Sequence, residues 1–598
     1  MAHLVIAPNF PNTPPQIKVA TDQWEEVYGD QAMSGLTLDQ AVAKVTAENP
    51  TFAVGTAEIR GTQYRVFSNA PDHIYALLLA SRAAHGDGAS DYLVFEDQRW
   101  TFDAFVQDVH RMARLLQRDY GVTKGTRVAL AMRNCPAMLI GMMAISALGG
   151  VTVFLNAWWT GAELDYALGD SSPKVALADD MRTDRLARLA QAHGLHVVNL
   201  GTAHEDHGAG LSDVLAQSDS RFDAAQIAAD DDFAIMYSSG TTGHPKGVVQ
   251  THRGAINAVF TWLMQAALTQ LIEPPEDDSS PAPRPVILIV TPLFHVTATH
   301  PMFLLSLPAG AKLVVMHKWC ADTAARLIDR EKVTRFLGVP TQSADLMEAA
   351  SRLGLTLDSL EYLGSGGAKR PAAQVAALSK RFPSAQIATG WGMTETNANG
   401  IGLVGRDYAR HPGAAGRLYP PVQDVRFLDD AGYEVAVGEV GEITVKSPCN
   451  MREYLNKPDA TAEVLQDGWL RTGDLGRIDA DGMITILDRK KNIIIRGGEN
   501  IACLDIEGAL HRHPGVREAC AFALPDDRLG EVVGAIVQAE GAVVPTEAAL
   551  QDFLATHIAH FKIPSRIWVQ AKPLPRGATD KLDRRGIRAA CLADADIR

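Results

Sequence analysis

A strand-like apolar run at residues 233–237 ends in a segment rich in glycine and hydroxyl side chains, Ser238 to Gly247. Glycine lets the backbone approach an anion closely, serine and threonine supply hydroxyl donors, and Lys246 supplies a positive charge. A buried strand that leads into such a loop predicts a phosphate-binding site. The segment is not the pattern G-x-x-x-x-G-K-[ST], because Pro245 precedes the lysine and no hydroxyl follows it. A plain surface loop of glycine, serine and threonine is the alternative.

Four further segments follow this loop in a fixed order: 390–396 (GWGMTET), 469–474 (WLRTGD), 488–500 (DRKKNIIIRGGEN) and 573–581 (PLPRGATDK). Together with the loop they resemble the adenylate-forming enzymes, which include acyl- and aryl-CoA ligases, firefly luciferase and the adenylation domains of peptide synthetases. The resemblance runs from about Thr101 to about Arg588 and is closest in appearance to fatty acyl-CoA ligases.

The order of strand and helix signals predicts an α/β fold. At 598 residues the chain is too long for one hydrophobic core. A capped helix begins at Thr101 and ends at Gly121, and strands and helices then alternate to about residue 400, which favours parallel sheets covered by helices. After about residue 415, short strand-like runs separated by turns predict a small β subdomain. We therefore expect an N-terminal extension (1–75) packed on the main domain, an ATP- and acid-binding domain (76–490) and a small mobile α+β domain (491–598).

Composition limits the possible partners and location. The formal net charge of −14 argues against a general nucleic-acid or anionic-membrane binder. The six cysteines lack C-x-x-C spacing, so neither a zinc site nor a disulfide framework is indicated, and with no signal peptide visible we expect a cytoplasmic protein. The uncharged stretch 137–155 approaches the ~20 residues of a membrane span. Because Gly149 and Gly150 divide it, it predicts a buried helix followed by a buried strand and no integral membrane segment.

The resemblance implies how ATP and its metal are held. In the family the glycine-rich loop grips the β- and γ-phosphates, a role that falls here on Thr241, Gly243 and Lys246. Glu395 is implied as the Mg²⁺ ligand and Thr394 as a contact to the α-phosphate; one carboxylate is chemically adequate for this hard cation. By itself, Thr394-Glu395 would indicate only a helix cap. The residues predicted to bind ATP or AMP are Ser238, Ser239, Gly240, Thr241, Thr242, Gly243, Lys246, Gly366, Gly367, Ala368, Trp391, Gly392, Thr394, Asp474, Arg489 and Lys581.

Among these, Trp391 is expected to form a platform for adenine, and Asp474 to bind both ribose hydroxyls with Arg489 beside it. The acid is expected to be apolar, because no Arg or Asp stands out as a counter-charge for a polar tail. His295 ends a segment that resembles the wall beside the reacting carboxylate, and a structural histidine that caps the strand end is the alternative. The predicted acyl pocket comprises His295, Val339, Gly366 and Trp391, and the predicted CoA path comprises Arg496, Gly497 and Gly498.

The implied activity is an acid–CoA ligase that works in two steps on a hydrophobic medium- or long-chain or bulky alicyclic acid. Acid and ATP give acyl-AMP and pyrophosphate, and the CoA thiol then displaces AMP. The catalytic residues implied by the resemblance are Lys246, Thr394, Glu395 and Lys581, and Lys491 matches the hinge about which the small domain turns. Asp580 departs from the family, which usually has glycine before the lysine. The expected partners are the acid, ATP, CoA and Mg²⁺, and the oligomeric state stays open, with a homodimer among the possibilities.

Other functions share these motifs. An aryl-acid CoA ligase and an enzyme that loads a separate carrier protein would both carry them, and so would a luciferase-like oxygenase. A non-catalytic nucleotide-binding protein could keep the fold, although retention of both Glu395 and Lys581 argues against it.

Overall fold

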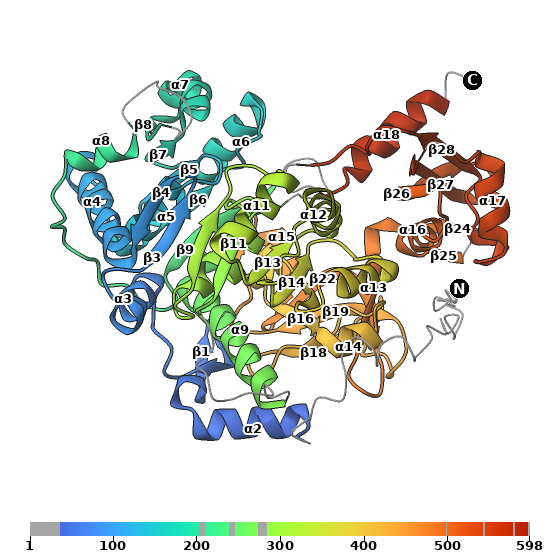
Figure 1. Cartoon of the computed structure of the whole chain (residues 1–598), viewed down its shortest axis with the longest axis horizontal. Helices are drawn as coiled ribbons and strands as arrows, with labels where there is room; N and C mark the ends of the chain where they lie inside the picture. Colours follow the sequence, from blue (N-terminus) through green and yellow to red (C-terminus); the bar gives the residue numbers. More distant parts are fainter. Residues whose placement is uncertain are drawn as a thin grey trace.

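The computed structural model describes residues 36–201, 210–238, 245–272, 284–497, 499–541, 544–577 and 581–595. It confirms the expected mixed α/β architecture, in which a large body built on two extensive sheets carries a smaller α+β body near the C-terminus (Figure 1).

The first large sheet has seven strands and is mostly parallel. Five adjacent strands, β9, β6, β5, β7 and β8, are parallel to one another. At one edge of the sheet, β10 is antiparallel to β9 and β20 is antiparallel to β10. In order across the sheet the strands are β20 (Glu453–Tyr454), β10 (Lys246–Thr251), β9 (Asp232–Ser238), β6 (Val151–Phe154), β5 (Arg127–Ala131), β7 (Val175–Ala178) and β8 (His196–Asn199).

The second large sheet has nine strands and is parallel from β15 to β3. In order across the sheet they are β17 (Arg417–Leu418), β16 (Gly400–Val404), β15 (Gln386–Gly392), β14 (Tyr362–Gly366), β13 (Arg335–Gly338), β11 (Val286–Ile289), β12 (Lys312–Val315), β3 (Asp91–Phe95) and β4 (Gln98–Thr101). The parallel strands are short apolar runs, as expected for strands that are covered on both faces.

Helices cover both faces of each sheet, so the body is layered as helices, sheet, helices, sheet, helices. The largest apolar core lies between the two sheets and includes Leu130, Phe105 and Leu313. The central helices are α3 (Ile74–His85), α4 (Phe102–Tyr120), α5 (Pro136–Ala147), α9 (His252–Ile272), α10 (Val296–Ala298) and the π-helix η2 (Thr299–Leu304). The outer helices are α6 (Gly161–Ser171) and α7 (Asp180–His193) on the seven-stranded sheet, and α11 (Ala321–Glu331), α12 (Pro340–Leu353), α13 (Ala372–Arg381) and α14 (Gly405–Arg410) on the other.

Two local predictions are confirmed. Thr101 caps α4 by accepting a hydrogen bond from the Ala104 N–H, and Gly121 ends that helix in the left-handed region at φ 58°. The uncharged stretch 137–155 folds as the buried helix α5 followed by the buried strand β6.

One helix of the described ranges, α9, is long and apolar enough to cross a bilayer. Half of its most apolar 18-residue stretch is buried inside the protein, and Ile256, Phe260 and Met264 belong to the central core. A core helix passes the same test of length and composition, so this observation is weak evidence for a membrane span.

The N-terminal part of the described chain packs on the body. Helix α2 (Leu38–Glu48) contacts α9, and the antiparallel hairpin of β1 (Val54–Ile59) and β2 (Thr62–Phe67) follows it. Ala41 and Phe67 lie in the central core. The proposed extent of an extension, 1–75, stays a prediction.

A small antiparallel sheet of five strands extends from the body at residues 424–489. Its strands are β18 (Asp424–Leu428), β19 (Gly441–Lys446), β22 (Trp469–Ile478), β21 (Leu465–Gln466) and β23 (Ile484–Arg489), and the short helix α15 (Pro458–Val464) precedes β21. It matches the β subdomain that the sequence predicts after residue 415.

The C-terminal body has its own sheet and core, which includes Ile494, Ile506 and Val533. Its strands are β24 (Ile493–Arg496), β25 (Glu499–Ala502), β26 (Val516–Asp526), β27 (Gly530–Ala539) and β28 (Arg566–Gln570), and its helices are α16 (Cys503–Leu510), α17 (Glu547–Ala555) and α18 (Arg584–Ala595). A boundary at 490/491 stays a prediction.

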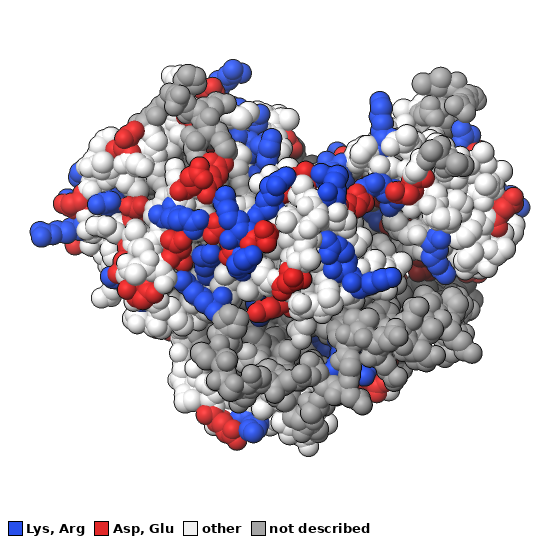
Figure 2. Space-filling view, in the orientation of Figure 1, with Lys and Arg blue, Asp and Glu red and all other residues white. Residues whose placement is uncertain are grey.

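The space-filling view shows a notch between this body and the rest of the molecule (Figure 2). On the face that it presents, Lys and Arg side chains are interspersed with Asp and Glu rather than gathered into one basic surface.

Candidate active site

The predicted nucleotide residues gather where parallel strands end. Ser238 ends β9, Gly366 ends β14, and Gly392 ends β15. In open α/β sheets, ligands bind outside the carboxyl ends of the strands, so these ends form the expected location for a substrate. Ser239, Gly240, Thr241, Thr242 and Gly243 of the predicted phosphate loop lie outside the described residues, as do Gly498 and Asp580.

The two residues that flank the phosphate loop are adjacent in space. Ser238 at the end of β9 pairs with Lys246 at the start of β10 across the antiparallel ladder. The Lys246 ammonium lies 4.6 Å from the centroid of the Tyr454 ring. The loop is therefore a connection between neighbouring strands, and its lysine begins the second of them.

Glu395 lies in a tight, buried turn. The 3₁₀ turn η3 (Thr394–Thr396) follows β15, and the Gln250 side chain fixes it by donating to the Thr394 carbonyl at 2.9 Å. The Tyr454 hydroxyl donates to Glu395 Oε1 at 2.9 Å. Both Thr394 and Glu395 are buried, at 8% and 6% exposed. A carboxylate buried to this degree and held by a single oxygen is poised to meet a cation with the other.

The donor set suits a magnesium ion that arrives with ATP. Within the described ranges no group of three or more His, Cys, Asp or Glu side chains could hold a metal ion alone. Mg²⁺ commonly binds through one or two carboxylates together with waters and substrate phosphates. Glu395 provides such a carboxylate, and therefore the residues fit a metal shared with the nucleotide.

The predicted ribose residues meet on two neighbouring strands. Asp474 in β22 and Arg489 in β23 are register partners, and Arg489 Nε lies 2.7 Å from Asp474 Oδ1. The Trp391 indole N–H donates to Asp474 Oδ2 at 2.8 Å. Burial raises the pKa of Asp474, against the lowering effect of the Arg489 guanidinium. Asp474 is thus a buried acceptor fixed by one cation and one neutral donor.

Asp474→Asn should raise the KM for ATP about tenfold, because a hydrogen bond to a charged acceptor contributes roughly 1.5 kcal/mol or more. The matched measurement uses 2′-deoxy-ATP. The wild-type enzyme should discriminate against this analogue, and the variant should lose most of that discrimination. Unchanged kinetics with ATP and undiminished discrimination would show that the ribose binds elsewhere.

Lys581 reaches this site from the C-terminal body. Its Cε lies 2.6 Å and its Nζ 3.1 Å from the point that a Cβ on Gly367 would occupy, so a larger residue there would displace the end of the lysine side chain. Gly367 also has φ +77°, a conformation that suits glycine. Burial and, to a smaller extent, the Arg489 guanidinium lower the pKa of Lys581 to about 8, against the raising effects of Asp474 and Glu395. The ammonium therefore shares one electrostatic environment with the ribose and metal residues.

This lowered pKa of Lys581 predicts a pH dependence. Only the protonated lysine can neutralise phosphate charge, so kcat/KM for ATP in acyl-adenylate formation should fall above about pH 8 by up to about tenfold per pH unit. The reaction of supplied acyl-AMP with CoA should show no such fall. An adenylation rate that keeps rising through pH 9 would contradict a role for the charged lysine.

The predicted acyl residues lie around the same strand ends. His295 caps the start of α10, rather than the end of a strand, by accepting from the Thr297 N–H at 3.3 Å. Burial and the nearby Lys581 charge lower the pKa of His295 to about 3, which keeps the imidazole neutral near pH 7. Val339 precedes α12 and is 5% exposed, and Gly366 is buried at the end of β14. His295 thus caps a helix and lies within electrostatic reach of Lys581, and its place in an acyl pocket stays a prediction.

The described contacts of the predicted CoA-path residues lie within the C-terminal body. Arg496 and Gly497 belong to the hairpin of β24 and β25, where Arg496 pairs with Glu499 and the Gly497 N–H donates to the Leu529 carbonyl. Lys491 lies in the short 3₁₀ turn η4 (Lys490–Asn492) that joins β23 to β24. The described contacts of the hairpin thus differ from those of Lys581, which lies at Gly367.

Comparison with known proteins agrees with this arrangement. The AMP-binding enzyme family matches residues 80–455, and the AMP-binding enzyme C-terminal domain matches residues 505–581. The chain belongs to the AMP-binding enzyme family.

Individual relatives of this AMP-binding enzyme are CoA ligases. It is 31% identical to the long-chain-fatty-acid–CoA ligase FadD13 of Mycobacterium tuberculosis, over 81% of this chain and 92% of that protein. It is 34% identical to a feruloyl-CoA synthase of an Amycolatopsis species, over 76% and 88% of the two chains. Its fold is similar to ATP-bound MatB from Rhodopseudomonas palustris, with a TM-score of 0.76, 28% identity and coverage of 87% and 98%. The relatives support an acyl-CoA synthetase.

Two residues of the site were not anticipated from the sequence of this AMP-binding enzyme. Tyr454 contacts both Glu395 and Lys246, and Gln250 holds the Thr394 carbonyl. Tyr454 lies in a two-residue strand, and Gln250 is buried near the end of β10, directly after Val248 and Val249. A polar side chain in the middle of the run Val248–Thr251 is the one signal that could have indicated a buried role for Gln250.

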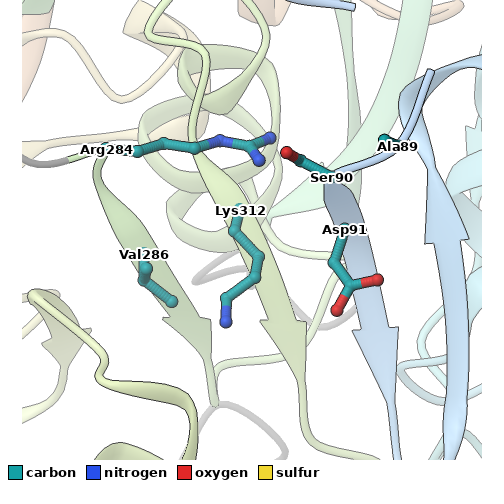
Figure 3. A pocket seen from close by; sticks show the side chains of 6 residues that line it. All are labelled: Ala89, Ser90, Asp91, Arg284, Val286 and Lys312. Atoms are coloured by element: carbon teal, nitrogen blue, oxygen red, sulfur yellow. The ribbon is translucent and has the colours of Figure 1, made fainter. Parts of the chain in front are cut away.

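A hollow of the AMP-binding enzyme lies at the end of the nine-stranded sheet opposite to the candidate active site (Figure 3). Its volume is about 460 Å³, and it is lined by Ala89, Ser90, Asp91, Arg284, Val286 and Lys312. Strands β3, β11 and β12 begin here, so the hollow faces their amino ends, whereas substrates of open α/β sheets bind at the carboxyl ends. It is therefore separate from the candidate active site.

Proposed function

We propose that the chain is an ATP-dependent carboxylic acid–CoA ligase. A carboxylate oxygen of the acid attacks the α-phosphorus of ATP and pyrophosphate leaves, which gives acyl-AMP. The sulfur of CoA then attacks the acyl carbon, the bond from that carbon to the AMP oxygen breaks, and AMP leaves. The observation that carries the proposal is Lys581, which lies against Gly367 beside Asp474 and Glu395.

The first step joins two anions, so its barrier falls when positive charge surrounds them. Lys246 and Lys581 provide fixed ammonium groups from two different bodies. Asp474 and Arg489 would hold the ribose and so align the α-phosphorus, and Glu395 would hold the metal. Mg²⁺, when bound with ATP, would neutralise charge on the phosphate oxygens.

The second step needs a different face of the C-terminal body. Lys581 occupies the position beside Gly367, and the Arg496–Gly497 hairpin makes its described contacts within its own sheet. A rotation about Lys491 would withdraw the lysine and bring the hairpin to the acyl-adenylate. We propose that the two half-reactions use these two orientations in turn.

We propose a hydrophobic acid as the substrate. Among the described residues, Arg370 is a buried cation close in sequence to Gly366, and it contacts Ser365, Ser343 and Gln374. Successive residues of a strand face opposite sides of the sheet. Since Arg370 contacts Ser365, it lies on the side of the sheet opposite to the one that position 366 faces. Arg370 is thus unsuited to bind a polar tail in the pocket, which supports an apolar substrate.

A homologous series of acids tests this substrate class. Each buried methylene should contribute at most ~0.8 kcal/mol, so kcat/KM should rise by up to about fourfold per methylene until the pocket is full. The readout is CoA-dependent release of AMP from acetate upward through medium- and long-chain acids. A flat or falling series would contradict a hydrophobic pocket.

An aryl acid is the second candidate. The relative with the higher identity of the two described above is the feruloyl-CoA synthase, at 34%. The same assay with hydroxycinnamic, benzoic and polycyclic acids separates the two: the highest kcat/KM on an aryl acid would replace the aliphatic proposal without changing the reaction type. No AMP release with any acid would contradict the ligase itself.

A further inference from the structure

Tyr454 connects the two charged side chains that face the predicted phosphate site. Its hydroxyl donates to Glu395 Oε1 at 2.9 Å, and its ring centroid lies 4.6 Å from the Lys246 ammonium. The side chain is 7% exposed, so both contacts are shielded from solvent. One residue thus touches the metal ligand through its polar tip and the phosphate lysine through its aromatic face.

The backbone around Tyr454 is tied to both partners. Strand β20 pairs with β10, with Tyr454 opposite Val248, and the Leu455 N–H donates to the Gly247 carbonyl at 2.7 Å. On the other side, the Met451 N–H donates to the Glu395 carbonyl at 2.7 Å. The Tyr454 N–H donates to Thr461 Oγ1 at 2.9 Å. A displacement of this segment would therefore move the phosphate strand and the Glu395 turn together.

Each contact has a definite chemical consequence. A phenol hydrogen bond to one carboxylate oxygen fixes the rotation of the Glu395 side chain and leaves the second oxygen for a cation. A ring face attracts an ammonium and restricts the flexible lysine stem to one region. We propose that Tyr454 is a positioning residue that couples metal binding at Glu395 to phosphate binding at Lys246. This inference rests on the proposed function, since it concerns how the same site binds ATP with its metal.

Calorimetric titration of the full chain with ATP tests the coupling without any turnover. The measured quantity is the ratio of the Kd for ATP in EDTA to the Kd for ATP with saturating Mg²⁺. Removing a group that orients a metal ligand commonly costs 10–100-fold in metal affinity, so Tyr454→Phe should lower this ratio at least about tenfold. Affinity for ATP in EDTA should change less than about twofold, because the ring that faces Lys246 is retained. An unchanged ratio, or a wild-type ratio near one, would overturn the proposal.

Tyr454→Leu tests the aromatic face. It removes the ring as well as the hydroxyl, so ATP affinity in EDTA should fall about two- to fivefold below that of Tyr454→Phe. Equal affinities of the two variants would overturn the part of the proposal that concerns Lys246. Thermal unfolding of both variants identifies any loss of folded protein, and Tyr454→Phe alone still tests the metal part.

Tyr64 supplies a matched control elsewhere in the chain. It is 8% exposed, and the Lys446 ammonium lies 5.5 Å from its ring centroid. Tyr64→Phe therefore removes a similarly buried hydroxyl beside a similar lysine but away from Glu395, and it should leave the Mg²⁺ ratio unchanged. An equal loss in this variant would overturn the assignment to Tyr454.

The two proposals can fail separately. If Tyr454→Phe lowers the Mg²⁺ ratio as expected yet the wild-type chain forms no acyl-adenylate with any acid, the proposed function fails and the role of Tyr454 stands. If adenylation proceeds and Tyr454→Phe keeps the wild-type ratio, the role of Tyr454 fails and the proposed function stands.

Discussion

Lys581→Ala should reduce acyl-adenylate formation by ~10²–10³-fold, the typical loss when one preorganised contact to developing charge is removed. The lysine reaches Gly367 from the C-terminal body, in the electrostatic environment of Asp474 and Glu395. There it can balance charge as pyrophosphate departs. The rate of thioester formation from supplied acyl-AMP and CoA should remain near the wild-type rate, because the proposed rotation would withdraw the lysine before that step.

The control for this variant is Lys572→Ala. Lys572 is an exposed lysine of the same C-terminal body, so its removal changes the net charge equally without touching the site. Both half-reactions should stay near wild type. Adenylation by Lys581→Ala at the wild-type rate would show that the lysine does not take part in the first step.

Lys491→Pro should have the opposite effect. Proline fixes φ near −65° and restricts the residue before it, so it should hinder the change of backbone conformation at η4 that a rotation requires. Adenylation should remain within a few-fold of wild type, whereas thioester formation from supplied acyl-AMP should fall at least about tenfold, as expected for an impaired hinge. The readouts are single-turnover rates of the two half-reactions.

Lys491→Ala separates the backbone from the side chain. It removes the ammonium and leaves φ free, so both half-reactions should stay close to wild type if the hinge acts through the backbone. Equal damage to both steps by the proline variant would contradict a rotating C-terminal body.

Local elements were well predicted because their signals are local. Helix α4 has apolar residues at helical spacing, a threonine N-cap and a glycine that ends it, and each of these acts within one turn. The division of 137–155 into helix α5 and strand β6 followed from a glycine pair between them. The mostly parallel sheets followed from the alternation of strands and helices, since such crossovers bury both faces of a sheet.

The site was predicted as a set of residues but not as a geometry. The resemblance named Asp474 and Arg489 separately, and their ion pair depends on the register of β22 with β23, which contains an irregularity. The approach of Lys581 to Gly367 depends on how two bodies are oriented, and no local pattern specifies that. Tyr454 was missed because its role arises from a two-residue strand at a sheet edge, too short to carry a periodic signal.

Buried Arg370 illustrates the same limit. In the sequence it follows Lys369 and resembles part of an exposed charged pair, since arginine is rarely fully buried. In the fold its guanidinium is buried and donates to the neutral side chains of Ser365, Gln374 and Ser343, and burial lowers its pKa to about 10. Three acceptors that come together only in the folded chain make this burial possible.

The central claim is that the acid is activated as an acyl-adenylate, and the fate of oxygen tests it most directly. A carboxylic acid labelled with ¹⁸O in its carboxylate is incubated with the enzyme, ATP, Mg²⁺ and CoA, and the AMP is analysed by mass spectrometry. Attack of the carboxylate on the α-phosphorus, followed by cleavage of the acyl carbon–oxygen bond by CoA, predicts AMP that carries one ¹⁸O atom per thioester formed. Unlabelled AMP, or label recovered in pyrophosphate or inorganic phosphate, would contradict the account.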